Sequence, residues 1–155
     1  MRILLSAYAC RPNAGSEPGY GWNWATHLAA RGIEVHVLAN HRNQALIENT
    51  LRESPTPNLR FTFLRVPSRF AAKSEGLHYI WWQWIALSAT SRLHEEQAFD
   101  LVHHVTYGSV HVPSQLWRLG IPVVFGPVGG GQTAPSKMLS YFGAHKMSER
   151  IRTML

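Results

Sequence analysis

Short apolar runs that alternate with longer stretches of helical periodicity constrain this chain more than any other feature of its sequence. The runs, which we expect to form strands, cover residues 2–7, 34–39, 60–66, 100–104 and 121–125. The stretches expected to form helices cover residues 17–30, 42–52, 76–96, 109–118 and 137–154. Such alternation is typical of stacked βαβ units around a parallel sheet. We therefore predict a Rossmann-like, three-layer αβα fold with a mostly parallel sheet, formed as a single domain over residues 1–155.

Composition narrows the classes of protein to which the chain can belong. Its 155 residues are enough to bury one core, and its single cysteine, Cys10, excludes an internal disulfide. No segment approaches the ~20 apolar residues that cross a bilayer, and the apolar N-terminal run is too short for a signal peptide. We therefore expect a cytoplasmic protein, and a peripheral position at the inner face of the membrane stays open.

The charge indicates phosphate-bearing partners without choosing among them. A net charge of +6 suits sugar nucleotides, nucleic acid or an anionic membrane leaflet. The basic residues are spread along the chain, with a loose group at Arg60, Arg65, Arg69 and Lys73. Because no dense Lys/Arg tract is present, we expect no nucleic-acid partner.

The loop after the first apolar run has the residues of a strand-to-helix turn that approaches phosphate. Ser16 is the expected N-cap of the following helix, and Gly15 lets the backbone come close to a ligand. Free N–H groups at the helix start would then face phosphate oxygens. The alternative is a turn whose glycines serve packing alone. The spacing of Gly15, Gly19 and Gly21 does not match G-x-G-x-x-G, and no G-x-x-x-x-G-K-[ST] occurs, which excludes the nicotinamide and P-loop classes.

The loop after the last apolar run is the most unusual segment of the chain. Gly129, Gly130 and Gly131, followed by Gln132, stand between two prolines. Such a run suits a main chain that bends next to a ligand or hinges between lobes, and the alternative is a flexible surface loop. Because ligands bind beyond the carboxyl ends of parallel strands, we expect this bend and the one at Gly15 to form the floor of one cleft.

Three further side chains are candidates for the chemistry of that cleft. His104 ends the fourth apolar run, and Tyr107 follows in the next loop. An imidazole there would hydrogen-bond an acceptor hydroxyl or a donor phosphate, although a structural histidine explains the same residue. Glu17 either orients the acceptor or only complements the dipole of its helix. No carboxylate or cysteine cluster accompanies the histidines, so we expect no metal and no cofactor.

The expected helix over residues 76–96 is apolar nearly all round. Trp81, Trp82 and Trp84 are candidates for membrane contact, because indole rings favour membrane interfaces and basic residues precede the helix. Packing of this helix in the core is the alternative.

Taken in order, several of these segments resemble one family. They cover residues 12–17, 28–32, 34–38, 99–104 and 122–127, and they are similar to the N-terminal domain of family 4 glycosyltransferases with the GT-B architecture. The resemblance implies transfer of a sugar, of the hexosyltransferase type, from a nucleotide-sugar donor to a saccharide or lipid-linked saccharide acceptor, with retention of configuration and without a metal. It also implies a role in polysaccharide biosynthesis.

The resemblance further implies a division of labour between two Rossmann-like lobes. The N-terminal lobe holds the acceptor, and its first loop, here Gly15 and Ser16, approaches the donor diphosphate. The second lobe supplies most donor contacts, so we expect the natural protein to continue beyond Leu155 and this part alone to be inactive. Many relatives carry a histidine just after the fifth strand, whereas residues 125–128 here contain none, and no catalytic residue is transferred to that position.

Two other classes of function remain open at this point. One is a stand-alone Rossmann-like module that binds nucleotide or a partner protein without catalysis, which the lack of an identifiable catalytic pair favours. The other is a basic nucleic-acid binder, which rests on charge alone.

Overall fold

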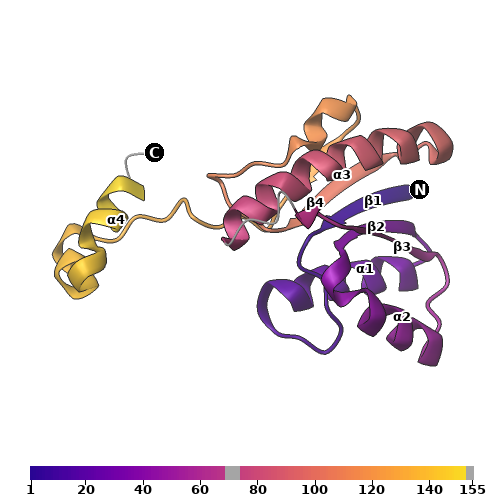
Figure 1. Cartoon of the computed structure of the whole chain (residues 1–155), viewed down its shortest axis with the longest axis horizontal. Coiled ribbons are helices and arrows are strands. Elements are labelled where there is room, and N and C mark those ends of the chain that lie inside the picture. Colours follow the sequence, from indigo (N-terminus) through magenta and orange to yellow (C-terminus); the bar gives the residue numbers. More distant parts are fainter. Residues whose placement is uncertain (69–73, 153–155) are drawn as a thin grey trace.

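The computed structural model describes residues 1–68 and 74–152, so the basic residues Arg69 and Lys73 lie outside its description. Its sheet has five parallel strands in the order β3-β2-β1-β4-β5 (Figure 1). The strands are β1 (Arg2–Ala7), β2 (Glu34–Asn40), β3 (Leu59–Leu64), β4 (Leu101–Thr106) and β5 (Val123–Phe125). The sequence prediction of a parallel sheet is therefore confirmed, with strand ends displaced by at most two residues.

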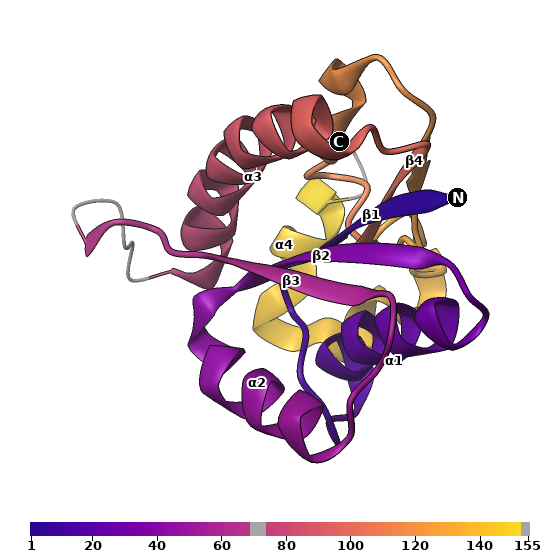
Figure 2. The same cartoon turned by 90° about the vertical axis from the view of Figure 1, so that its right-hand side faces the viewer.

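Helices cover both faces of the sheet, as Figure 2 shows: α1 and α2 lie on one face and α3 on the other. The α-helices are α1 (Ser16–Ala30), α2 (Gln44–Glu53), α3 (Glu75–Gln97) and α4 (Lys146–Arg152). Residues 1–68 and 74–152 also include the 3₁₀ segments η1 (His41–Asn43), η3 (Gln115–Leu119) and η4 (Ser136–His145). The three-layer αβα architecture predicted from the sequence is therefore the fold of the chain.

The central strands are apolar because they are buried on both faces. In β1, Leu4 joins the core cluster under α3, whereas Leu5 joins the cluster under α1 and α2. Both side chains are fully buried. Successive side chains of a strand point to opposite faces, so a run without polar alternation is what a central parallel strand requires.

The long helix α3 has one buried face and one exposed face. Its N-cap is Ser74, whose hydroxyl accepts a hydrogen bond from Leu77 N–H at 3.4 Å, and it ends at Ala98 in the left-handed conformation. The residues that face the core are His78, Tyr79, Trp82, Gln83, Ala86 and Thr90. Trp82 is fully buried, so its prediction as a membrane-contact residue is wrong: the helical period places it on the face that packs on the sheet.

The helix expected over residues 109–118 does not form. Val110 N–H instead donates to the Gly129 carbonyl at 3.1 Å, in a parallel bridge between Ser109 and Gly129. Pro113 has no N–H to continue a helix, and only η3 follows it. This part of the chain therefore pairs with the glycine-rich loop rather than with itself.

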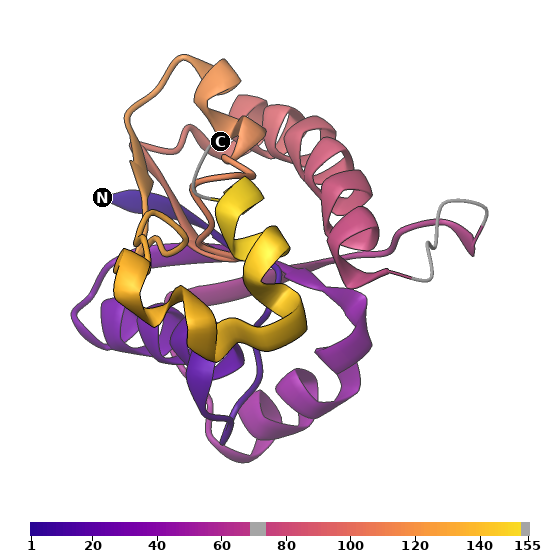
Figure 3. The ribbon, with the colours of Figure 1, turned by 90° about the vertical axis from the view of Figure 1, so that its left-hand side faces the viewer.

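The last expected helix is only partly α-helical. Within residues 136–152, η4 carries Gly143 in the left-handed region at φ 51°, and the α-helix begins at Lys146. These two elements pack on each other, as Figure 3 shows, and they lie apart from the three layers in Figure 1. Residues 153 and 154 of the expected helix lie outside the description. None of the helices in residues 1–68 and 74–152 is long and apolar enough to cross a membrane.

Candidate functional site

Three loops meet at the carboxyl ends of β1, β4 and β5. The Glu17 carboxylate accepts a hydrogen bond from Gly108 N–H at 3.1 Å, which links the start of α1 to the loop after β4. Gly129 N–H donates to the Gly108 carbonyl at 2.7 Å, which links that loop to the one after β5. Order 3-2-1-4-5 places these loops at the switch point of the sheet, where ligands of open α/β folds bind.

A cavity of about 760 Å³ opens at this junction. Its lining comes from α1, from the first two turns of α3 and from the loops after β4 and β5: Glu17, Ser74, Gly76, Leu77, Tyr79, Ile80, Tyr107, Gly108, Ser109, Val112, Gly129 and Gly130. Glu17 is the single carboxylate among these residues. The volume lies in the range of small-molecule sites, and one charged group within a mixed apolar and hydroxyl lining suits a polyhydroxylated ligand with an apolar part.

A second, smaller cavity of about 330 Å³ lies at the opposite edge of the sheet and is lined in part by Arg2, Glu34 and Arg60. Arg2 and Glu34 there form an ion pair at 3.1 Å. Because the amino ends of parallel strands do not carry the ligand sites of this fold class, the cavity at the carboxyl ends is the candidate site.

Gly108 is the residue that allows the loops to approach so closely. A Cβ added there would lie 1.9 Å from the carbonyl oxygen of Pro127, a distance that no side chain tolerates. The sequence did not indicate Gly108 as a site residue, because a lone glycine after a strand carries no distinctive signal.

The first loop matches its prediction in position but not in detail. Gly15, not Ser16, is the N-cap of α1, and no side chain caps this end. A Cβ added at Gly15 would meet nothing within 4 Å, so packing does not require a glycine there. Gly15 and Ser16 are exposed just before Glu17, but neither lines the cavity. Their contact with a donor diphosphate stays a prediction.

The loop after β5 adopts a defined bend at the cavity. Gly130 N–H donates to the Gln132 side-chain oxygen at 3.2 Å, and His111 Nε2 lies 3.2 Å from the Gly130 carbonyl. Gly129 and Gly130 line the cavity, whereas Gly131 and Gln132 are exposed outside it. The two glycine-containing bends therefore lie at the same edge of the sheet, as the sequence predicted.

His104 is part of the core rather than of the cavity. Its ring is fully buried, and Nε2 lies 2.8 Å from the Tyr79 hydroxyl oxygen and 3.2 Å from the Tyr107 carbonyl oxygen. Burial lowers the pKa of His104 to about 4, so the ring is neutral at pH 7. The prediction that His104 contacts substrate is therefore wrong, and the structural alternative holds because its strand position points into the packing under α3.

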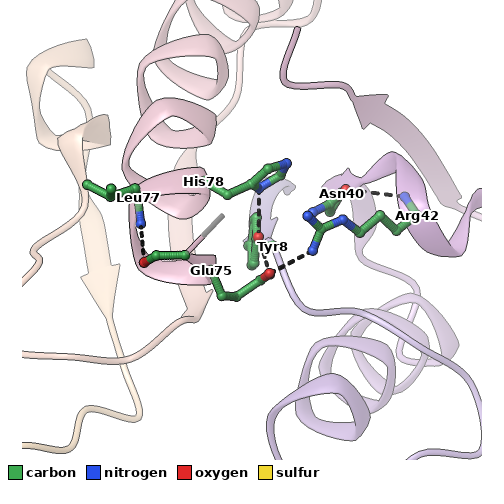
Figure 4. Close-up of polar contacts among 7 residues, drawn as sticks. Tyr8, Asn40, Arg42, Glu75, Leu77 and His78 are labelled. Carbon is green, nitrogen blue, oxygen red and sulfur yellow. Dashed lines mark hydrogen bonds and ion pairs between the residues drawn. The ribbon is translucent and has the colours of Figure 1, made fainter. Parts of the chain in front are cut away.

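Tyr8, Arg42, Glu75 and His78 form a polar cluster (Figure 4). The Tyr8 hydroxyl donates to the Glu75 carboxylate and lies 2.8 Å from His78 Nδ1. Arg42 Nη1 donates to both Glu75 oxygens, at 2.9 and 2.7 Å. The cluster thereby ties the loops after β1 and β2 to the first turn of α3, where Ser74 and Gly76 line the cavity.

The charges of this cluster are fixed by its contacts. Burial alone would raise the pKa of Glu75, but the hydrogen bonds from Tyr8 and Arg42 outweigh it and leave that pKa below its ordinary value. Burial and then the Glu75 carboxylate raise the pKa of Tyr8. Glu75 is therefore an anion and Tyr8 a neutral phenol at pH 7. The sequence did not reveal this cluster, because Arg42 and Glu75 are 33 residues apart and pair only in the fold.

Tyr107 connects the polar cluster to the cavity. Its ring lies 5.0 Å from that of Tyr8 and 5.2 Å from that of Tyr79, between centroids, and it lines the cavity. Burial, and then the carboxylates of Glu75 and Glu17, raise the pKa of Tyr107. Its hydroxyl is therefore available as a hydrogen-bond donor at neutral pH.

Within residues 1–68 and 74–152, no group of three or more His, Cys, Asp or Glu side chains is placed to hold a metal ion. The expectation that the reaction needs neither metal nor cofactor stays a prediction.

A five-stranded parallel sheet with a cavity at its switch point defines a Rossmann-like ligand-binding domain. The comparison with protein families is consistent with this class. The sequence model of glycosyltransferase family 4 matches residues 20–148, and the chain belongs to this family. No curated protein matches the chain.

Proposed function

We propose that the chain is the acceptor-side lobe of a retaining glycosyltransferase of the hexosyltransferase type, which transfers a sugar from a nucleotide-sugar donor to a saccharide or lipid-linked saccharide. The observation that carries the proposal is the convergence of Glu17, Tyr107 and the Gly129–Gly130 bend on one cavity at the switch point. A role in polysaccharide biosynthesis belongs to the same proposal.

Each group in the cavity has a chemical role in this proposal. Glu17 accepts hydrogen bonds from acceptor hydroxyls with the part of its carboxylate not used by Gly108, and thereby orients the nucleophile. Tyr107 donates to a hydroxyl or glycosidic oxygen of the acceptor. Gly15 and Ser16 face the donor diphosphate, which a second lobe would hold in place. Bond cleavage itself is assigned to no residue of this lobe.

The proposed location is the cytoplasm, where nucleotide sugars serve as donors, and a peripheral contact with the inner face of the membrane belongs to the proposal. The competing function is a non-catalytic nucleotide- or protein-binding module. The lack of a catalytic histidine in residues 125–128 favours that alternative.

Amide NMR titration of the ¹⁵N-labelled chain tests the proposal. Addition of hexoses and disaccharides should shift the amides of residues 107–109 and 129–130, and UDP-glucose or GDP-mannose alone should bind only weakly. Glu17→Gln should weaken saccharide binding by roughly tenfold, since a hydrogen bond to a charged group contributes about 1.5–3 kcal/mol. Glu48→Gln, at an exposed position of α2, is the matched control and should change nothing.

Two results would decide against the acceptor lobe. Saccharide-dependent shifts confined to the cavity near Arg2 and Arg60 would place the site at the wrong edge of the sheet. Tight binding of a nucleotide sugar without any response to saccharides would favour the stand-alone nucleotide-binding module.

A further inference from the structure

The exposed face of α3 carries a strip of large apolar side chains. Leu77, Ile80, Trp81 and Trp84 follow the spacing i, i+3, i+4, i+7, which places them on one side of the helix. They are 53%, 40%, 40% and 48% exposed. Their buried counterpart Trp82 points the other way, so the core does not account for these four residues.

A cationic group lies at the end of this strip. The Arg118 guanidinium carbon lies 5.6 Å from the centroid of the Trp84 ring and 5.3 Å from that of the Trp117 ring. Trp117 comes from η3 and is 62% exposed. The ion pairs in the described part of the chain are Arg2–Glu34 and Arg42–Glu75, so no carboxylate there neutralises Arg118. We call Leu77, Ile80, Trp81, Trp84, Trp117 and Arg118 the tryptophan strip.

The strip leads directly into the candidate site. Leu77 and Ile80 belong both to the strip and to the lining of the cavity. A ligand whose polar end occupies the cavity beside Glu17 would therefore place its remainder along the exposed face of α3. Apolar patches of this extent on a protein surface mark interaction sites.

Among the partners that an apolar patch can bind, a lipid surface fits the side chains of the tryptophan strip best. Indole rings take positions at the bilayer interface, with the ring body in apolar surroundings and the N–H toward water. A guanidinium held between two such rings lies at the depth of the headgroup phosphates and pairs with them. The net charge of +6 further attracts an anionic leaflet.

We propose that the tryptophan strip docks on an anionic phospholipid bilayer, with Arg118 binding a headgroup phosphate between Trp84 and Trp117. One consequence of this docking rests on the proposed function. The acceptor is then lipid-linked: its saccharide enters the cavity past Leu77 and Ile80, and its lipid stays in the membrane. Docking itself requires neither donor nor acceptor.

Vesicle co-sedimentation of the whole chain tests the docking, with phosphatidylcholine vesicles that contain or lack phosphatidylglycerol. The wild type should bind the anionic vesicles at low salt. Arg118→Gln should weaken this binding about fivefold, in line with ~1 kcal/mol per basic residue at the surface. The double variant W84A/W117A should weaken it by roughly tenfold or more. Trp24→Ala is the matched control, because Trp24 is also 40% exposed but lies on α1.

Every other outcome overturns the docking. If Trp24→Ala weakened vesicle binding as much as W84A/W117A, or if the wild type did not bind vesicles at low salt, the strip would have no specific affinity for lipid. Displacement by glycerol 3-phosphate in solution would assign Arg118 to free phosphates. A dimer in sedimentation equilibrium that Trp117→Glu dissociates would make the strip an interface between two copies. The saccharide titration of the cavity is carried out without vesicles. Each experiment can therefore contradict its own proposal, the docking or the proposed function, without affecting the other.

Discussion

Tyr79 and His104 show how a residue that resembles a catalytic group becomes part of the core. The two side chains are hydrogen-bonded at 2.8 Å under α3, and both are buried. Strand alternation alone leaves open which of His103 and His104 faces the cleft, because both faces of a central strand are covered. His103 Nε2 in turn lies 2.8 Å from the Gly126 carbonyl, on the other face.

Burial of neutral His104 makes stability depend on pH. Its pKa is lowered from 6.5 to about 4, so below pH 6.5 the unfolded chain binds a proton that the folded chain does not. The stabilisation is complete above pH 6.5 and is lost as the pH falls toward 4, by roughly 3 kcal/mol for this residue. His36, His41 and His78 have lowered pKa values as well and add to the same trend.

Urea unfolding at pH 7 and near pH 4.5 measures this contribution. His104→Gln should be less stable than the wild type at pH 7, but its free energy of unfolding should fall less between the two pH values. His27→Gln, at an exposed position of α1, is the matched control. An unchanged pH dependence in His104→Gln would show that this imidazole has the same pKa in the folded and the unfolded chain, and so is not kept neutral by burial.

At the scale of elements, the sequence predicted the helices and strands whose positions follow from local periodicity. The strand over residues 2–7 has the predicted bounds, because its buried apolar run ends at a loop rich in Pro, Asn and Gly. For α3 the sequence predicted a helix that is apolar nearly all round, but not which of its sides packs on the sheet. That choice depends on Tyr79 and Trp82 meeting Tyr8 of β1's loop, a contact between residues more than 70 positions apart.

The prediction of a helix over residues 109–118 was wrong for the same physical reason. Its backbone pairs with Gly129, a partner that is distant in sequence and that local periodicity does not reveal. The position of the candidate site was predictable from the sequence: it lies at the carboxyl edge of the sheet, where the bends at Gly15 and Gly129–Gly131 were expected. The contacts of Gly108 and of the cluster around Tyr8 were not, because each depends on the positions of three loops at once.

The junction of these loops should be sensitive to a single methyl group. Gly108→Ala would place a Cβ 1.9 Å from the Pro127 carbonyl, so the loops after β4 and β5 must separate. We expect a loss of about 2–4 kcal/mol in the free energy of unfolding, together with loss of saccharide binding in the cavity. Urea unfolding and the amide titration measure the two effects.

Gly15→Ala is the matched control for this substitution. The added Cβ meets nothing within 4 Å, and φ at this position is −89°, which any residue adopts. Its free energy of unfolding should stay within about 0.5 kcal/mol of the wild type. A larger loss at Gly15 than at Gly108 would mean that the first loop, rather than the junction at Gly108, carries the packing of this edge.

At the scale of the whole molecule, the residues that form the core and those that line the candidate site both come from the sheet, the helices on its two faces and the loops between them. Both core clusters are built from residues between Leu4 and Val123. The cavity is likewise lined by residues between Glu17 and Gly130. Elements after the glycine-rich bend contribute to neither.

Removal of the chain from Ser136 onward should therefore leave the domain folded. Within the described residues of this segment, none is buried, and Tyr141 is 85% and Met147 64% exposed. Because η4 and α4 pack mainly on each other, their loss removes little apolar surface from the two core clusters, and the free energy of unfolding should change by no more than about 1 kcal/mol. Urea unfolding of the shortened chain measures the change, and its amide titration should retain the saccharide response at residues 107–109. A loss of several kcal/mol would mean that the terminal helices pack on the sheet in solution, and that the exposed Tyr141 and Met147 belong to the core rather than to a separate surface.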